Sequence, residues 1–422
     1  MTSRIRSGTQ GRTSTPRGAG SRAARRQPVR SRRGTPSIAA ATDGQRLATI
    51  LSLLFLVLTM FGLVMVLSAS SATSVHKLES TPFHQFKRQA MWAALGAVAF
   101  VVASRFDHRH FRRLATPLLG LTFAMLVAVL IPGLGRNLNG SNRWLGVGPA
   151  VFQPSEVAKF VMVVFIADLL SRRSARMDRP DLTVRPVAVV VGSLAGLLIL
   201  QPKLGTSVIL ASVALLMLFV AGARASSLMG WASFGLLLVA VAAYLEPYRR
   251  ARLFAFVDPW ADPLGSGLQT IQSQVGIASG GLLGVGIGNS RSKWGFLPEA
   301  HSDFIFAIVA EEVGLLGAGA LIVSFLLLGY LGVRTALHAA DRFGTLLAAG
   351  ITGWLIIQAF LNIGMAMGLM PITGEPLPFV SAGGSSLIMT LGAAGVLVSI
   401  ARTGSIKNAS VLDTSRAADN RS

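Results

Sequence analysis

Ten apolar segments recur along this chain, and most are long enough to cross a lipid bilayer as helices. A spanning helix needs about 20 mostly apolar residues. Only 14% of the residues are charged, whereas soluble domains carry about 25%. The sequence therefore predicts an all-α polytopic membrane protein with ten transmembrane helices. We expect these helices over residues 47–68, 89–104, 115–132, 156–171, 186–201, 205–222, 226–245, 304–331, 344–367 and 384–401.

Arginines in the short connecting loops set the expected orientation. Loops 105–114, 172–185 and 332–343 carry arginines, and loops of this kind stay on the cytoplasmic side of a membrane. The three loops alternate correctly with a cytoplasmic N-terminus, and an even number of spans returns the C-terminus to the same side. We therefore predict a multi-pass protein of the plasma membrane with both termini cytoplasmic.

Residues 1–44 are predicted to be a disordered, Arg-rich cytoplasmic tail. Residues 1–40 hold a dense set of arginines and no acidic residue, and such a segment cannot bury enough apolar surface to fold. Its charge is interpreted as a signal that retains the N-terminus in the cytoplasm, with attraction to anionic headgroups as a second role. No aromatic residues interleave the arginines, so no nucleic-acid partner is expected. The membrane domain follows at 45–402, and a short cytoplasmic tail at 403–422.

The composition also limits metal and disulfide chemistry. The chain has no cysteine, which excludes a disulfide framework and a thiolate metal site. Its six histidines lack the HxxH spacing of zinc sites. The sequence therefore identifies no metal ligands.

Every unusual motif lies in a segment that this orientation places outside the cell. The outward segments are 69–88, 133–155, 202–204, 246–303 and 368–383. The largest, the outer loop 246–303 between the seventh and eighth spans, is rich in Arg, Asp, Pro, Gly, Gln and Ser, and a loop this long usually carries function. We predict that the spans hold the outer loop over a lipid-facing cavity. The alternative is that the outward loops are simply longer.

The outer loop contains turn formers, amides and glycines. Asp258 and Asp262 each precede a proline, which keeps them out of the helical conformation and favours turns. Trp260 between them suits the headgroup level or the face of a sugar ring. Gln272 belongs to an amide-rich run at helical spacing that could bind the hydroxyls of a polar ligand. The glycine run 280–288 lacks a surrounding βαβ unit, so it is interpreted as close backbone packing or a hinge.

Asp303 stands where the outer loop enters the eighth span, preceded by Glu299 and His301. Aspartate is common as the N-cap of a helix, and a carboxylate here could also act as a catalyst, with a pKa that depends on burial against the helix dipole. The spacing alone leaves both roles open. Glu311 and Glu312 lie two turns deeper, and carboxylates inside a span usually face a cavity or a partner.

A second polar group marks the start of the fourth span. Ser155 is predicted to cap that helix, which places Glu156 in its first turn beside the positive end of the helix dipole. Lys159 is three residues further on, so Glu156 and Lys159 share a face. The two are either a local ion pair or a charged pair that lines the outer cavity.

Two other outward segments contribute cations and turns. Arg143 and Lys203 are candidates for binding a phosphate, Arg by bidentate contact and Lys as a point charge. The last outward stretch, Pro371–Ser386, has Pro-rich turns followed by glycines and serines. It is predicted to be a re-entrant or broken segment, which is tolerated at membrane depth only where it is buried in protein or lines a cavity.

Together these motifs resemble the SEDS family, the FtsW, RodA and SpoVE group of polytopic peptidoglycan polymerases. The resemblance covers residues 45–402, its motifs in this order are highly specific, and it is stronger for the cell-division FtsW branch than for the RodA branch. It rests on FKRQ at Phe86–Gln89, NRWLGVGP at Asn142–Pro149, QPSEVAK at Gln153–Lys159, DPWADPLGSG at Asp258–Gly267, LPEAHSDFIFA at Leu297–Ala307 and PLPFVSAGGSS at Pro376–Ser386.

The resemblance implies a bacterial glycosyltransferase that polymerises lipid II into β-1,4 glycan strands and releases undecaprenyl pyrophosphate. It makes Asp303 the catalytic residue, which we assign as general base. A divalent cation, Mg²⁺ or Mn²⁺, is a further candidate to stabilise the charge of the leaving pyrophosphate. The cations expected there are Arg143, Lys159, Arg249, Arg250 and Arg252. The other candidate substrate-binding residues are Trp144, Gln153, Glu156, Asp258, Trp260, Asp262, Gln272, Glu299, His301, Ser385 and Ser386.

Two other functions stay open on the sequence. One is a flippase that moves lipid II between leaflets, and the other is a non-enzymatic division scaffold that recruits a transpeptidase. The family's usual partner is a class B penicillin-binding protein, a one-span transpeptidase, and further division proteins are expected around it. A septal role fits the FtsW branch, but the sequence does not distinguish a septal role from a side-wall or spore role.

Four positions depart from the family pattern. Lys203 stands where Asp is usual, Leu268 and Ala382 each stand where Tyr is usual, and Glu375 is an unusual acid in its turn. None of them touches the HSDF motif, so activity is expected to be retained. Binding roles are not carried over to positions 203, 268 and 382.

Overall fold

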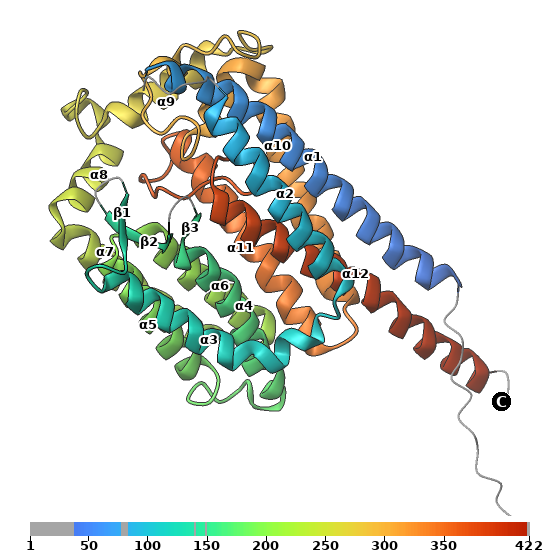
Figure 1. The fold of residues 1–422 in the computed structure, drawn as a ribbon. Helices are drawn as coiled ribbons and strands as arrows, with labels where there is room; N and C mark the ends of the chain where they lie inside the picture. Colours follow the sequence, from blue (N-terminus) through green and yellow to red (C-terminus); the bar gives the residue numbers. More distant parts are fainter. Residues whose placement is uncertain (1–37, 77–82, 139–140, 148–149, 420–422) are drawn as a thin grey trace, which may run out of the picture. The chain divides into compact units, whose positions relative to one another are not determined.

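Long helices coincide with the predicted spans in the computed structural model, which describes residues 38–76, 83–138, 141–147 and 150–419. No predicted span runs more than two residues past its helix. Most of the predicted tail 1–44 lies outside the described residues. The matching helices are α1 Ile38–His76, α2 His84–Arg105, α3 Arg109–Leu130, α4 Pro154–Arg172, α5 Val184–Leu200, α6 Leu204–Ala221, α7 Ala225–Leu245, α10 Ile305–His338, α11 Arg342–Ala366 and α12 Gly384–Asp419 (Figure 1).

The helices differ in how apolar they are. Among the described residues, seven helices are long and apolar enough to cross a membrane, namely α1, α3, α6, α7, α10, α11 and α12. α5 is apolar but shorter. α4 buries Glu156, Lys159 and Asp168 along its length. Because ionisable groups inside a span are costly and need partners, α4 is a candidate framework for a functional site.

α12 is central to the helix packing, and α7 is peripheral. α12 runs beside α2 and α1 and also contacts α10 and α11 (Figure 1). α7 packs against α5, α6 and α8, and Ala243 is its only buried side chain. An apolar helix can leave this much of its surface uncovered where lipid surrounds it. The exposed Leu and Phe side chains of α7 are therefore suited to a bilayer.

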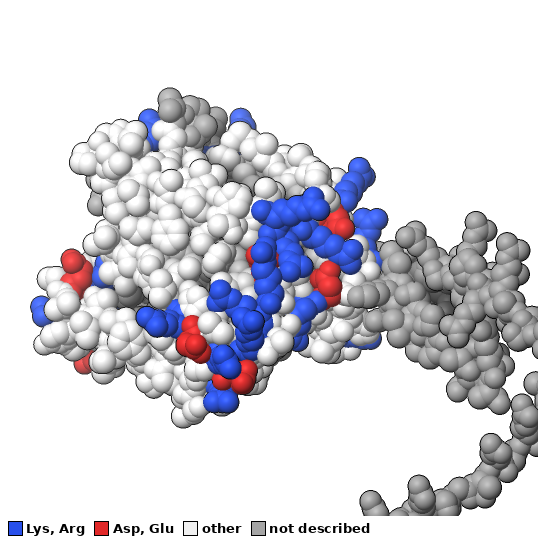
Figure 2. All heavy atoms as spheres, turned by 90° about the horizontal axis from the view of Figure 1, so that it is seen from below, with Lys and Arg blue, Asp and Glu red and all other residues white. Residues whose placement is uncertain are grey.

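Arginines gather on one face of the helix array, seen from below in Figure 2. Arg109 pairs with Asp341 at 2.9 Å, while Arg112 and Arg172 pair with Asp168 at 3.0 and 2.8 Å. These ion pairs bring together the start of α3, the end of α4 and the connection that follows α10. α10 therefore begins at the opposite end of the array, where the outer loop enters it.

One part of the all-α prediction is wrong, because the outward segment 133–155 contains a small antiparallel sheet. Its strand order is β1-β2-β3, with Trp144 opposite Arg136 and Leu145 opposite Phe152. The strands have only three to seven residues, which is too short for a clear alternating pattern in the sequence. They are β1 Arg136–Leu138, β2 Ser141–Val147 and β3 Ala150–Phe152.

The outer loop contains two short helices, α8 Pro247–Val257 and α9 Leu268–Ser279. α9 carries the amide-rich run, so its predicted helical spacing is confirmed. The two aspartates between the helices form turns. Asp258 Oδ1 accepts a hydrogen bond from the Trp260 backbone N–H at 3.0 Å, and Asp262 Oδ2 accepts one from the Ser266 N–H at 2.7 Å.

The glycine run 280–288 packs its backbone into a break in α10. Gly314 has φ +73° and ψ −170°, so the helix is interrupted there and loses its own backbone hydrogen bonds. The glycine run replaces them, since orphan peptide groups at membrane depth are costly. The interpretation as close backbone packing is confirmed. The bonds are Val285 N to Glu311 O (3.0 Å), Gly286 N to Glu312 O (3.0 Å), Leu315 N to Gly281 O (2.9 Å) and Leu316 N to Leu282 O (3.2 Å).

The side chains of Glu311 and Glu312 hold the same segment in place. Glu312 accepts hydrogen bonds from the Ser68 hydroxyl of α1 at 2.6 Å and lies 3.2 Å from Lys293 Nζ. Glu311 accepts from the Ser290 hydroxyl at 2.5 Å. Both carboxylates are buried. Glu311 and Glu312 therefore have partners, as predicted for carboxylates in a span. These partners are side chains that hold the fold together.

We expect Gly284→Ala to lower the free energy of unfolding more than Gly281→Ala. Both glycines have a positive φ, +81° and +55°, which costs another residue about 1–2 kcal/mol. A Cβ on Gly284 would lie 2.2 Å from Glu312 O, whereas nothing lies within 4 Å of one on Gly281. The clash adds about 1–3 kcal/mol. Thermal unfolding of the two variants in detergent measures the difference, and equal losses would contradict this packing.

Candidate functional site

Asp303 lies in the last turn of the outer loop and does not cap α10. The N-cap residue of that helix is Phe304, with no side-chain cap, so the N-cap interpretation of Asp303 is wrong. The Asp303 side chain is half-buried. Its backbone N–H donates to Glu299 O at 3.1 Å, and its carbonyl accepts from Asn362 Nδ2 at 2.8 Å. The Asp303 carboxylate is thus free for other roles.

The turn that carries Asp303 is anchored to the last outward stretch. The Ser381 hydroxyl donates to Ser302 O at 2.6 Å, and the Ala382 N–H donates to His301 O at 3.0 Å. Asn362 Nδ2 also donates to Glu375 O at 2.7 Å. Asn362 in α11 therefore binds both the Asp303 turn and the turn around Glu375, which holds the two against each other.

Charged groups from five segments of the chain interact electrostatically with the Asp303 carboxylate. Burial raises the pKa of Asp303 to about 6, and the negative charge of Glu299 adds to the rise. Lys203 and Arg252 oppose the rise, while Glu375 adds to it. Arg143 interacts electrostatically with the same carboxylate. An aspartate with a pKa close to neutrality is suited to accept a proton during a reaction.

Beneath Asp303 lies a buried polar cluster formed by Glu156, Lys159 and Glu375. Lys159 Nζ lies 3.0 Å from Glu156 Oε2 and 3.2 Å from Glu375 Oε2. The exposed fractions of the Glu156, Lys159 and Glu375 residues are 1%, 1% and 0%. The predicted pairing of Glu156 with Lys159 is confirmed. Lys159 cannot also reach a substrate phosphate, because its ammonium group is enclosed by these partners.

Helix α11 supplies the rest of this cluster. Gln358 Oε1 accepts from Lys159 Nζ at 3.0 Å and from Trp354 Nε1 at 2.8 Å, and Gln358 Nε2 donates to Pro376 O at 2.7 Å. Gln358 and Asn362 are not among the site residues predicted from the sequence. The available signal was an amide side chain inside an otherwise apolar span.

Arg143 and Gln153 have backbone roles in the structure. The Arg143 guanidinium donates from Nε to Gln201 O at 3.0 Å and from Nη2 to Pro202 O at 3.1 Å. This clamps β2 to the turn before α6. Gln153 is the N-cap residue of α4, so the predicted cap at Ser155 is wrong: Pro154 already starts the helix. The Gln153 N–H donates to the Ser385 hydroxyl at 3.1 Å.

The other predicted binding residues differ in how far they are buried. Ser385 and Ser386 are buried in the first turn of α12. Asp258, Trp260 and Asp262 occupy an exposed turn of the outer loop, where Trp260 is 68% exposed. Trp144, Gln272 and His301 are half-buried, and Glu299 is exposed. The structure therefore places Glu299 and His301 in the turn of Asp303 and gives Asp258 and Asp262 turn-forming roles.

A cavity of about 400 Å³ opens between α8 and the residues just before α9. The Arg252 guanidinium lies over the Tyr248 ring, 4.6 Å from its centroid. Since Arg252 also interacts with the Asp303 carboxylate, the cavity adjoins the site. It is lined by Tyr248, Ala251, Arg252, Gly265, Ser266, Leu268, Gln269 and Pro298.

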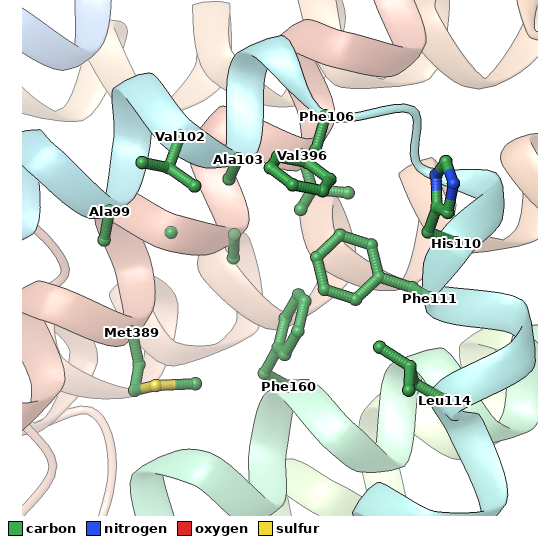
Figure 3. A pocket seen from close by; sticks show the side chains of 12 residues that line it. Ala99, Val102, Ala103, Phe106, His110, Phe111, Leu114, Phe160, Met389 and Val396 are labelled. Carbon is green, nitrogen blue, oxygen red and sulfur yellow. The ribbon is translucent and has the colours of Figure 1, made fainter.

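A second cavity of about 400 Å³ is almost entirely apolar and lies among α2, α3, α4 and α12 (Figure 3). Phe111 and Phe160 point toward each other across it, with ring centroids 5.5 Å apart. Phe160 follows Lys159 of the buried cluster directly. Other lining residues include Ala99, Val102, Phe106, Leu114, Met389 and Val396.

The arrangement of acidic and histidine side chains bears on whether a metal ion could bind. Among the residues that it describes, no group of three or more His, Asp or Glu side chains is arranged to hold a metal ion. Asp303 is instead surrounded by Lys203, Arg252 and Arg143. These residues do not fit a metal ion held by the protein alone.

Known proteins resemble this chain over most of its length. A family model described as "Cell cycle protein", for FtsW, RodA and SpoVE, matches residues 48–406. The probable peptidoglycan glycosyltransferase FtsW of Geobacter metallireducens is 40% identical over 84% of this chain and 95% of that protein. Stage V sporulation protein E of Bacillus subtilis is also 40% identical, over 84% of this chain and 96% of that protein.

Solved structures share the fold. One, which describes the structural coordination of polymerization and crosslinking by a peptidoglycan synthase complex, has a TM-score of 0.63 and 33% identity, covering 81% of this chain and 97% of that one. The rod shape determining protein RodA of Thermus thermophilus has a TM-score of 0.62 and 28% identity, with coverage of 83% and 95%.

Proposed function

Because the chain belongs to the FtsW, RodA and SpoVE family, we propose that it is a peptidoglycan glycosyltransferase. It polymerises lipid II into β-1,4 glycan strands in septal cell-wall synthesis and releases undecaprenyl pyrophosphate. The observation that carries this proposal is the Asp303 carboxylate, half-buried at the entry of α10 and within electrostatic reach of Lys203 and Arg252. Relatives named as glycosyltransferases at 40% and 42% identity support it.

The proposed membrane arrangement has ten spans, both termini in the cytoplasm and the outer loop outside the bacterial plasma membrane. The arginine-rich face supports this arrangement, because basic loops remain on the cytoplasmic side (Figure 2). Asp303 precedes α10, whose other end reaches the ion pairs of that face. Asp303 then lies at the external leaflet, where the substrate is presented.

In the proposed reaction Asp303 acts as general base. The 4-hydroxyl oxygen of the acceptor sugar forms a bond to the anomeric carbon of the donor, and the bond from that carbon to the pyrophosphate breaks. The hydroxyl proton passes to the Asp303 carboxylate. Such a base contributes about 10²–10⁴-fold to the rate. Attack in line on an α-linked donor inverts the configuration and yields the β linkage.

The surroundings of Asp303 supply the remaining parts of a lipid II site. Arg252 and Lys203 can stabilise the charge of the leaving pyrophosphate. The cavity beside Arg252 has a size and a Tyr, Ser and Gln lining that suit a saccharide. The apolar cavity of Figure 3 suits part of an isoprenoid chain. Arg143 has a clamping role, since two of its N–H groups bind backbone carbonyls.

A class B penicillin-binding protein is the proposed partner, together with other division proteins. A related solved structure concerns a complex that coordinates polymerization and crosslinking. The shared fold supports an equivalent transpeptidase on this chain.

Polymerisation by the purified full-length protein tests the proposal. Lipid II is supplied in detergent or nanodiscs, with and without the transpeptidase, and glycan chains are separated by electrophoresis. We expect glycan strands, in greater amount with the partner. Movement of lipid II between leaflets without product would favour a flippase. An Asp303→Asn chain that restores division in a deletion strain would favour a scaffold.

The polymerisation rate is expected to fall below pH 6. The pKa of Asp303 is raised from 3.8 to about 6, and only the ionised form accepts a proton, so the rate decreases about tenfold for each pH unit below 6. Stability responds in the opposite sense: the folded state holds this proton more tightly, so the contribution of Asp303 to stability is lost as pH rises through 6. Rates and thermal unfolding measured from about pH 3 to pH 8 separate the two effects. A polymerisation rate that falls only near pH 4 would show that Asp303 titrates like an ordinary aspartate.

A further inference from the structure

The buried cluster contains more negative than positive charge. Glu156 and Glu375 are two carboxylates, and the single ammonium group between them is that of Lys159, at 3.0 and 3.2 Å. A buried charge without compensation costs several kcal/mol. A second cation close to the cluster would offset this charge, and Lys203 interacts electrostatically with Glu375.

Lys203 is placed by the tight packing of α6 against the turn at 373–375. Lys203 is the half-buried N-cap residue of α6. A Cβ on Gly205 would lie 2.5 Å from Thr373 O and 3.1 Å from Glu375 Cγ, so the helix start and the turn are in direct contact. The Thr206 hydroxyl donates to Glu375 Oε1. The Lys203 charge favours the ionised form of Glu375.

The same turn reaches the Asp303 carboxylate. A Cβ on Gly374 would lie 3.5 Å from Asp303 Oδ2 and 3.9 Å from Arg252. Lys203 and Glu375 both act electrostatically on Asp303, in opposite directions: the ammonium favours ionisation of Asp303 and the carboxylate disfavours it. The Lys203 ammonium group thus interacts electrostatically with both Glu375 of the buried cluster and Asp303.

We propose that Lys203 and Glu375 are a coupled pair of positioning residues, in which Glu375, in the turn packed against the start of α6, restrains the Lys203 ammonium group and thereby fixes a cation in the site of Asp303. This inference rests on the proposed role of Asp303 as general base. The two residues are also two of the four departures from the family pattern, and the structure places them around one turn. The acid at 375 and the cation at 203 therefore compensate each other.

The other charged groups around Asp303 remain constant in the test. They are Glu299 in its own turn, Arg252 of α8 and Arg143 of β2. Lys203→Gln removes the cation, so the acidic limb of kcat/KM should move to higher pH. Glu375→Gln should move it to lower pH, and the double variant should return it toward wild type. For one charge at an effective permittivity of about 20, we expect the rate at pH 6 to change about three- to tenfold.

Charge reversal gives a sharper test. Lys203→Asp puts a third carboxylate beside Glu375 and Asp303, and its rate should fall by about tenfold or more. Adding Glu375→Gln to Lys203→Asp should recover most of that loss, which a purely structural role of either residue does not predict. Lys203→Arg keeps the charge and should retain the wild-type pH profile.

The experiment uses the purified full-length protein with lipid II, and each variant is first checked by thermal unfolding. Lys87→Gln, at an exposed lysine in the first turn of α2, is the matched control and should leave the profile unchanged. An unmoved acidic limb in Lys203→Gln and Glu375→Gln, or no recovery in the Lys203→Asp double variant, overturns the coupled pair. If Asp303→Asn is fully active, the general-base role of Asp303 fails, and if the wild-type protein makes no glycan strands, the proposed function itself fails, so these failures are distinguishable from failure of the coupled pair.

Discussion

Asp303→Asn should abolish glycan synthesis while leaving the fold intact. Asparagine fills the same volume but cannot accept the proton from the attacking hydroxyl, so the rate should fall by at least about 10²–10⁴-fold. The Asp303 backbone is held by Glu299 O and Asn362, and both contacts survive the substitution. Removing a half-buried charge that burial disfavours should not lower stability. Lipid II polymerisation and thermal unfolding, measured on one preparation, check both statements.

Asp181→Asn is the control for this experiment. Asp181 is an exposed aspartate in the loop between α4 and α5, on the side where the arginines gather. Its substitution removes the same chemical group without touching the site, so polymerisation should remain at the wild-type rate. A well-folded Asp303→Asn protein with wild-type activity would falsify the general-base assignment.

Lys159→Met should be the most destabilising single substitution among the buried polar residues of the site. It removes the ammonium group that lies 3.0 Å from Glu156 and 3.2 Å from Glu375. Two carboxylates then share a dry site, and breaking a buried ion pair costs about 3–5 kcal/mol. The free energy of unfolding in detergent measures the loss. Polymerisation should fall as well, because the turn around Glu375 supports Asp303.

A triple variant separates charge from shape in this cluster. Lys159→Met combined with Glu156→Gln and Glu375→Gln leaves no buried charge, and replacing a buried ion pair by uncharged groups is often nearly neutral. Most of the lost stability should therefore return. Lys87→Met, at an exposed lysine, should change the free energy of unfolding by less than about 0.5 kcal/mol. A Lys159→Met loss no larger than that of Lys87→Met would show that the cluster is not held by charge.

Some features of the site were recognisable in the sequence because their signals are local. The family follows from six short motifs in a specific order, the glycosyltransferase activity follows from the family, and comparison with known proteins supports both. The Glu156 and Lys159 pair follows from helical spacing and is confirmed. The predicted caps at Ser155 and Asp303 were wrong. Pro154 already starts α4, so Gln153 is its N-cap residue, and Phe304 is the N-cap residue of α10.

Other features had no local signal. The three short strands between α3 and α4 are held by pairing between strands rather than by a sequence pattern. Lys159 and Glu375 are 216 residues apart in the chain. The pairs that helical spacing can predict lie only three or four residues apart. The glycine run could be interpreted as close packing, but its partner, the break at Gly314 in α10, is visible only in three dimensions.

The sequence by itself determined the helical membrane architecture, and its motifs singled out Asp303 as the proposed general base, because apolar length and compact motifs are properties of consecutive residues. Tertiary structure alone decided which charges surround that acid. Lys203, Arg252 and Glu375 come from three separate segments, and their mutual distances depend on how α6, α8 and α11 pack. Electrostatic energy depends on those distances and on burial, and neither is encoded in any single stretch of the chain.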